Sequence, residues 1–454
     1  MSEIFKAYDV RGVVPDELND EWARAIGAAF AQVVAADQVI LGSDMRLSSE
    51  LLREALIDGL TGVGVDVVDL GLASTDLLYF ASGKLNLPGV MITASHNPGN
   101  YNGIKFCRAG ASPVGVESGL REVQELATKF VSSAVPVHAV RGARKDRPML
   151  GEYVEHVRSF VDVTKLRGLR VIADTANGMG GLIAPPVFES LGLDLEILFP
   201  ELDGSFPNHP ADPIQPENLV DLRAKVLSAG ADVGLAFDGD ADRVFLVDDK
   251  AAPISGSTTT ALIARRVLGR SPGETILYNL ICSKAVPEVI AEMGGTAIRT
   301  RVGHSFIKAE MARTGAIFGG EHSGHYYFRD NYRADSGMIA ALTVLEEMAI
   351  QGSSLSELRR SLERYSDSGE VNTKVQSTPQ DVLAFVENAY QGRAQVDHLD
   401  GLTLDFGEWW FNLRPSNTEP LLRLNLEAPT DDEVSRRSHE VLAVVAKADS
   451  EGRR

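Results

Sequence analysis

The sequence predicts an α/β protein in which three related α/β domains with mixed, mostly parallel sheets precede a smaller C-terminal α+β domain. Its 454 residues exceed what one hydrophobic core can organise, and about 150 residues per domain would give roughly three domains. Short β-branched runs alternate with helical patterns from the N-terminus to about residue 360, which is typical of βαβ units. After that point the pattern changes to paired strands and one final helix.

A unit of strand, polar turn and helix recurs three times, which supports three related domains. The units are Val39-Ile40-Leu41 with Gly42-Ser43-Asp44 and a helix after Ser48, Val171-Ile172-Ala173 with a turn from Asp174 to Gly178, and Ile276-Leu277-Tyr278 with Asn279, Leu280 and Ser283. The C-terminal stretch differs, because residues 409–413 and 421–426 have the pattern of two strands joined by a turn. Thr430 and Glu433 then form a capping box ahead of the last helix.

These patterns divide the chain into residues 1–147, 148–249, 250–367 and 368–454. The first boundary falls in a basic, proline-containing stretch at residues 135–148, which is either a linker or a solvated loop. The second follows a strand at Asp248-Asp249-Lys250, and the third lies within residues 365–369.

Composition narrows the class of protein. Hydrophobic residues make up 44% and charged residues 24%, as in soluble globular proteins, and the net charge of −19 argues against nucleic acid or an anionic membrane as a partner. The apolar run at residues 25–36 is too short to span a bilayer and is expected to be a buried helix face, and we find no signal peptide. Cys107 and Cys282 form no disulfide framework, so a reducing cytoplasm fits best. The oligomeric state, monomer or homodimer, stays open.

The segment Asp238-Gly239-Asp240-Ala241-Asp242-Arg243 has three carboxylates at alternate positions. In a loop they can converge on one hard cation such as Mg²⁺ or Ca²⁺, and without a cation they would repel one another. An EF-hand is excluded, because its sixth position should be glycine and the flanking patterns are strands. An ordinary acidic turn is the alternative.

A second motif, Thr93-Ala94-Ser95-His96-Asn97-Pro98, follows the apolar run Val90-Met91-Ile92. A serine in a turn at the end of a buried strand is well placed to be an exposed nucleophile. A Ser–His hydrolase is a poor interpretation, because adjacent extended residues point to opposite sides and no G-x-S-x-G surrounds Ser95. A structural turn serine remains the alternative.

Two further motifs offer polar groups. Gly319-Gly320-Glu321-His322-Ser323-Gly324-His325 lacks the regular spacing of a zinc site and could instead bind sugar hydroxyls and transfer a proton. The other motif is Arg414-Pro415-Ser416-Asn417-Thr418-Glu419-Pro420, followed by Arg423. It offers a guanidinium, hydroxyls, an amide and turn N–H groups, which could bind a phosphate. The alternative is an ordinary hairpin turn.

Together, in this order and at these separations, the four motifs resemble the α-D-phosphohexomutase family over essentially the whole chain. Residues 93–98 match its phosphoserine loop, 238–243 its metal loop D-G-D-x-D-R, 320–325 its sugar loop and 414–420 its phosphate loop. The N-terminal segment Lys6-Ala7-Tyr8-Asp9-Val10-Arg11-Gly12 is also similar to the family's A-Y-D-x-R-G.

The resemblance implies four domains around a central cleft, a hexose phosphate substrate, Mg²⁺, and a hexose 1,6-bisphosphate as activator and intermediate. It implies that Mg²⁺ is held by phosphorylated Ser95 with Asp238, Asp240 and Asp242. The implied catalytic residues are Ser95, His96, Lys105, Arg11, Arg243 and His325. The implied substrate-binding residues are Tyr8, Arg301, Gly303, His304, Glu321, Ser323, Arg414, Ser416, Asn417, Thr418 and Arg423.

Within the family, the sugar loop ending in His325 and containing His322 is most similar to bacterial phosphomannomutases. Ile281 stands where many dual-specificity phosphomannomutase/phosphoglucomutase members carry a lysine. The expected reaction moves a phosphoryl group between Ser95 and the 1- and 6-positions of the sugar, with Lys105 or His325 managing the hydroxyl proton. A phosphatase or a non-catalytic sugar-phosphate binder ranks lower, because the chain keeps the nucleophile, the aspartates and a second phosphate loop together.

Overall fold

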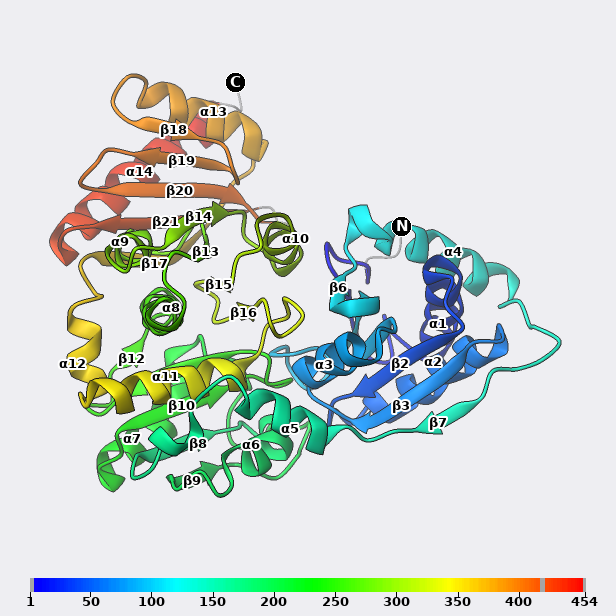
Figure 1. The fold of residues 1–454 in the computed structure, drawn as a ribbon. Helices are drawn as coiled ribbons and strands as arrows, with labels where there is room; N and C mark the ends of the chain where they lie inside the picture. Colours follow the sequence, from blue (N-terminus) through cyan, green and yellow to red (C-terminus); the bar gives the residue numbers. More distant parts are fainter. Residues whose placement is uncertain (1–3, 417–420, 452–454) are drawn as a thin grey trace.

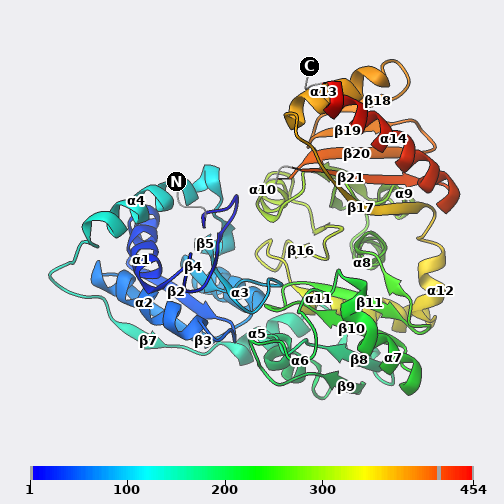
Figure 2. The ribbon, with the colours of Figure 1, turned by 180° about the vertical axis from the view of Figure 1, so that it is seen from behind.

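The computed structural model describes residues 4–416 and 421–451, and four β-sheets within them define four domains. Domains two, three and four form a column, and domain one lies beside it, in contact with domains two and three (Figures 1 and 2). Within the described residues, no helix has both the length and the apolar character that a membrane crossing would need.

Domain one has a sheet of strand order β1-β5-β4-β2-β3-β7, with β6 paired to β5. Its elements are β1 (Val10–Val13), α1 (Asp20–Val34), β2 (Gln38–Ser43), α2 (Ser49–Gly62), β3 (Asp66–Leu72), α3 (Thr75–Leu85), β4 (Gly89–Ile92), β5 (Tyr101–Arg108), β6 (Ser112–Pro113), α4 (Leu120–Ser133) and β7 (Arg144–Asp146). The central strands β4, β2 and β3 are parallel, whereas β5 is antiparallel to β4 and β1. The stretch predicted as a linker or loop contributes β7, which extends the sheet beside β3.

Domain two has the strand order β12-β11-β10-β8-β9, with β10, β8 and β9 parallel. Its elements are α5 (Leu150–Arg158), β8 (Arg170–Asp174), α6 (Gly180–Phe188), β9 (Asp194–Leu198), α7 (Val220–Ala229), β10 (Val233–Phe237), β11 (Val244–Asp248) and β12 (Pro253–Ile254). Because β12 pairs with β11, this sheet continues past the boundary predicted at residue 249.

Domain three has the strand order β14-β13-β15-β16, in which only the pair β15–β16 is antiparallel among the described residues. Its elements are α8 (Gly256–Arg270), β13 (Thr275–Asn279), α9 (Ala285–Glu292), β14 (Thr296–Thr300), α10 (His304–Thr314), β15 (Phe318–Gly320), β16 (Tyr326–Phe328), α11 (Gly337–Gln351) and α12 (Leu355–Arg360). The apolar helix α11 packs against α8, and also against α5 and β11 of domain two.

Domain four is an antiparallel sheet of order β17-β21-β20-β19-β18. Its elements are β17 (Ser366–Lys374), α13 (Pro379–Ala389), β18 (Gln395–Asp397), β19 (Leu402–Asp405), β20 (Trp410–Pro415), β21 (Leu421–Ala428) and α14 (Asp431–Glu451). The two predicted strands are β20 and β21, and the prediction did not include the other three. One half of the predicted capping box forms, since Thr430 accepts from the Glu433 amide, whereas the Glu433 carboxylate binds Arg436 and Arg437.

The hydrophobic core of the last domain is separate from the core that joins the other three domains. One continuous core extends through domains one, two and three, and it includes the fully buried side chains of Tyr153, Phe318 and Leu345. Domain four has its own core between its sheet and the helices α13 and α14, around Val386, Phe411 and Val441. Domain four is therefore attached to a body that is already packed.

Candidate functional site

The predicted serine and metal loops meet at the boundary between domains one and two. Ser95 lies in the turn after β4, and Asp238 begins the loop between β10 and β11. The Ser95 hydroxyl donates to Asp238 Oδ2 over 2.7 Å. A bond between residues 143 positions apart brings together two motifs that the sequence could only place separately.

Burial of Ser95 corrects the prediction of an exposed nucleophile, because the residue is only 4% exposed. The metal loop covers it from domain two. A Cβ at Gly239 would lie 2.3 Å from the Ser95 carbonyl oxygen, so the central residue of the D-G-D motif has to be glycine for the two loops to approach. Ser95 has a φ of 50°, a strained conformation for a serine, which other contacts must maintain.

His96 lies closer to Ser95 than an extended backbone would allow. Its Nδ1 is 3.4 Å from Ser95 Oγ, because the left-handed turn at Ser95 places both side chains on one side; the expectation that they diverge is wrong. The Arg243 guanidinium lies 2.5 Å from the same Nδ1 and 3.3 Å from Ser95 Oγ. The charge of Arg243, together with burial, holds the pKa of His96 well below its usual value, so His96 is a neutral acceptor here.

Arg46 holds the serine loop in place, and sequence reasoning missed it. Its buried guanidinium donates to four backbone oxygens: those of Ser95, Asn97 and Pro98 in that loop, and that of Tyr101 at the start of β5. Its Nε lies 3.3 Å from a carboxylate oxygen of the buried Asp44. The only signal in the sequence was a basic residue two positions after the acidic end of the first strand–turn unit.

Replacing Arg46 with methionine is expected to destabilise the protein by about 3–5 kcal/mol, because Asp44 would stay buried without its cation. Replacing it with lysine retains the charge but supplies at most three donors to four carbonyls. We expect Arg46→Lys to lower kcat with little change in KM, since the loop carries Ser95 and does not hold the sugar. Denaturant unfolding and steady-state kinetics measure the two effects.

Arg53 provides the matched control, because it is another buried arginine of domain one, paired with Asp69. Arg53→Lys should lose stability without a selective loss of kcat. An equal loss of kcat in both lysine variants would show that Arg46 acts only through general stability.

The three aspartates form one compact group of oxygens. Ligand atoms of Asp238, Asp240 and Asp242 all lie within 4.8 Å of one another. Lys105 Nζ is 2.7 Å from Asp240 Oδ2 and 2.7 Å from Asp242 Oδ2. The other oxygens of these two carboxylates, Asp240 Oδ1 and Asp242 Oδ1, are buried and have no hydrogen-bond partner. Two buried, unsatisfied carboxylate oxygens side by side fit a divalent cation, and they distinguish this loop from an ordinary acidic turn.

Burial and neighbouring charges shift the pKa values of Asp238 and Asp240 in opposite directions. Burial raises the pKa of Asp238 to about 8, even though Arg243 lies beside it. Burial also acts to raise the pKa of Asp240, but Lys105 outweighs it and holds that pKa well below the usual range. For Lys105, burial alone would lower the pKa of the ammonium, yet the two carboxylates hold it well above its ordinary value.

The N-terminus of α3 supports the metal loop, and this was not predicted. The Thr75 hydroxyl donates to Asp240 Oδ2, and its amide donates to the Asp240 carbonyl over 3.2 Å. The next residue, Asp76, accepts from Tyr153 of domain two and from Ser336, the N-cap of α11. Domains one, two and three therefore converge within a few residues of the aspartates.

The sugar loop contributes His325 to the same place. His325 Nε2 lies 3.9 Å from Asp242 Oδ1, and its Nδ1 lies 3.0 Å from Ser323 Oγ. Glu321 is buried, and three protein donors occupy its carboxylate: the Tyr327 hydroxyl at 2.7 Å, the Gly303 amide at 3.0 Å and the Asn279 amide at 3.3 Å. In this structure Glu321 fixes the loop through these three donors, and its Oε2, which accepts only from Tyr327 among them, keeps capacity for a sugar hydroxyl.

The N-terminal segment and the start of α10 bring further predicted residues of domains one and three together. Arg11 donates to Asn97 of the serine loop over 2.7 Å. Tyr8 packs edge-on against His304, and Arg301 stacks on Phe306 at 4.1 Å. Tyr8 and Arg301 share the wall of a cavity of about 1070 Å³ between the N-terminal segment and α10.

The predicted phosphate loop is only partly described, because Asn417 and Thr418 lie outside the described residues. Arg423 Nη2 lies 3.4 Å from Ser416 Oγ. Arg414 is buried, and its guanidinium binds Glu370 at 2.7 Å and Asn425 at 2.8 Å. In this structure Glu370 occupies the Arg414 guanidinium, so a phosphate would have to compete with Glu370 for it.

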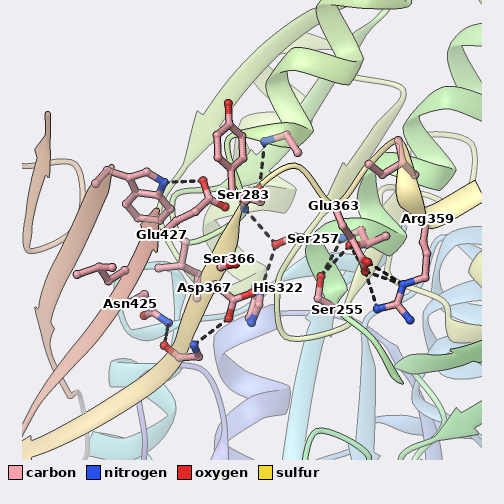
Figure 3. Close-up of a pocket in the computed structure, with 18 of the residues that line it drawn as sticks. Ser255, Ser257, Ser283, His322, Arg359, Glu363, Ser366, Asp367, Asn425 and Glu427 are labelled. Carbon is pink, nitrogen blue, oxygen red and sulfur yellow. Dashed lines mark hydrogen bonds and ion pairs between the residues drawn. The ribbon is translucent and has the colours of Figure 1, made fainter. Parts of the chain in front are cut away.

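A cavity of about 380 Å³ lies at the junction of domains three and four (Figure 3). His322, the variable residue of the sugar loop, lines it and lies 3.1 Å from Ser257 Oγ. Ile281 and Asn425 also line it. Glu427 closes one side by accepting from Trp410 and from the Lys284 amide.

Comparison with known families matches all four domains. Residues 2–130, 151–251 and 255–365 match the phosphoglucomutase/phosphomannomutase α/β/α domains I, II and III. Residues 370–444 match the C-terminal domain of the same proteins.

Whole-chain relatives agree with this match. The chain is 40% identical over 436 residues to a phosphomannomutase of Escherichia coli strain K12, covering 94% of this chain and 95% of the relative. It is 39% identical over 429 residues to the phosphohexose mutases of Xanthomonas campestris, with coverage of 94% and 95%. Among solved structures, a phosphoglucomutase/phosphomannomutase family protein from Burkholderia thailandensis superposes with a TM-score of 0.90 at 32% identity, covering 99% of this chain and 98% of that one.

Proposed function

Because the chain belongs to the phosphoglucomutase/phosphomannomutase family, we propose that it is a phosphomannomutase that interconverts mannose 6-phosphate and mannose 1-phosphate through phosphorylated Ser95. The observation that carries the proposal is the 2.7 Å contact between Ser95 Oγ and Asp238, at the edge of the three-aspartate cluster. The preference for mannose rests on relatives near 40% identity that are named phosphomannomutases.

The residues around Ser95 suit a phosphoryl carrier. In the first half-reaction the bond from phosphorus to Ser95 Oγ breaks while a bond to the free 1- or 6-hydroxyl of the sugar forms, giving a hexose 1,6-bisphosphate. Arg243, 3.3 Å from Ser95 Oγ, can stabilise the negative charge of the transferred group. A magnesium ion held by Asp238, Asp240, Asp242 and the phosphoserine would supply further positive charge there.

The hydroxyl that attacks must lose a proton. Lys105 directs its ammonium at two carboxylates, whereas the His325 ring is 23% exposed and held by Ser323. His325 is therefore the better-placed acceptor of the two. In the second half-reaction the bisphosphate has turned, Ser95 Oγ takes the other phosphoryl group, and the same proton returns to the sugar oxygen that is released.

Substrate preference is tested with coupled assays on mannose, glucose and glucosamine 1-phosphates, each with a trace of the matching 1,6-bisphosphate. We expect the highest kcat/KM with mannose 1-phosphate. A higher value with glucose 1-phosphate would make the enzyme a phosphoglucomutase or a dual-specificity mutase. Release of free phosphate at the rate of substrate consumption would contradict mutase activity itself.

A further inference from the structure

One face of the domain-four sheet is polar and carries the arginines of the phosphate loop. Residues directly opposite each other in antiparallel strands share a face. The register pairs Glu370 with Asn425, Asn425 with Asn412, and Arg423 with Arg414. The alternate residues Leu413 and Leu424 belong to the hydrophobic core on the other face. Because Asn425 also lines the cavity with His322, the polar face is directed at domain three (Figure 3).

Two like charges lie side by side on this face. Arg414 and Arg423 are cross-strand neighbours, an arrangement that repels unless an anion lies between the guanidinium groups. Glu370 supplies the anion, with Oε2 at 2.7 Å from Arg414 Nη2 and Oε1 at 3.3 Å from Arg423 Nη1. Each carboxylate oxygen contacts a different arginine, which is the way a phosphate group would also bridge them.

Exposure distinguishes this carboxylate from a purely structural one. The Arg414 side chain is 7% exposed and is also held by Asn425, so it keeps its place without Glu370. The side chains of Glu370 and Arg423 are 30% and 33% exposed, so both can be reached from the solvent side. An arriving phosphate would therefore compete with Glu370 for guanidinium groups that are already in position.

We propose that Glu370 is a positioning residue that competes with the non-reacting phosphate of the substrate for Arg414 and Arg423, so that this phosphate can be released when the bisphosphate turns. The proposal rests on the proposed mutase function, because only a mutase has to release and bind again the phosphate held at this end. When the phosphate leaves, the Glu370 carboxylate binds both guanidinium groups again. The arginines are then not left without an anion, which lowers the free-energy cost of separating the phosphate from them.

Glu370→Gln keeps the size and one acceptor but removes the charge. We expect it to bind mannose 6-phosphate and glucose 6-phosphate about threefold to tenfold more tightly than the parent. Binding is measured by calorimetric titration in a Ser95→Ala background, where the Ser95 carrier is absent. In the Ser95 enzyme the same substitution should lower KM in both directions and also lower kcat, because release becomes slower.

Asp367→Asn is the matched control, since it removes one negative charge from the same strand while Asp367 accepts from the Gly369 amide. Equal tightening in this control, or unchanged or weaker binding in Glu370→Gln, would overturn the proposal. If Glu370→Gln does not fold, Glu370→Ala removes the same carboxylate and must shift the affinity in the same direction. Mannose 6-phosphate and glucose 6-phosphate carry the same phosphate group. If the preference for mannose were wrong, the coupled substrate assays would show it, but the ratio of the affinities of Glu370→Gln and the parent would not change.

Discussion

Ser95→Ala is expected to lower turnover by about a thousandfold or more while the protein stays folded. The substitution removes the only side-chain oxygen of residue 95, which is the atom that would carry the phosphoryl group. Since the surrounding groups act on that atom, their contribution to the rate is lost with it. The fold should persist because the turn is held through backbone oxygens, four of which bind Arg46. Arg243 remains beside Asp238, so that carboxylate keeps a partner.

Intact-mass analysis gives a readout that does not depend on the assay. Protein incubated with a hexose 1,6-bisphosphate should gain the mass of one phosphate group, and Ser95→Ala should not. Ser43→Ala, at another buried serine where a strand of domain one ends, is the control and should keep both the added phosphate and the activity. Turnover near the parent value in Ser95→Ala would eliminate Ser95 as the carrier.

Removal of divalent metal is the second change with a large expected effect. EDTA should abolish activity and Mg²⁺ should restore it, because Asp240 Oδ1 and Asp242 Oδ1 are buried without a hydrogen-bond partner. Asp240→Asn should weaken Mg²⁺ binding by about tenfold to a hundredfold and lower the rate further, since it removes a ligand charge next to the reacting phosphoryl.

Binding of Mg²⁺ can be followed without activity, because a ligand of the folded state raises the melting temperature. We expect Mg²⁺ to stabilise the parent and not Asp240→Asn. Asp221→Asn, at an exposed position of α7, should respond as the parent does. Full activity after complete metal removal would contradict the assignment of the cluster.

The motif-bearing loops could be recognised from the sequence, whereas the residues that contact them from other parts of the chain could not. Asp238 to Arg243 could be recognised because its residues are neighbours in the chain and the apolar runs beside it have the pattern of strands. Thr75 and Asp240 are 165 positions apart, and Arg414 and Glu370 are 44 apart, so only the packed domains and the strand register bring them together. The prediction of an exposed Ser95 was wrong for the same reason, because the residue that covers it, Gly239, comes from another domain.

The separate core of domain four has a consequence for how the chain becomes ordered. The shared core of the first three domains extends to Leu362, so it closes only after most of the chain has left the ribosome. The apolar centre of domain four shares no residue with this core, so local unfolding of domain four would leave the larger core packed. Domain four is therefore a packing unit of its own, and Arg414 and Glu370 both belong to it. Their contact can survive when this unit shifts as a whole against the aspartates.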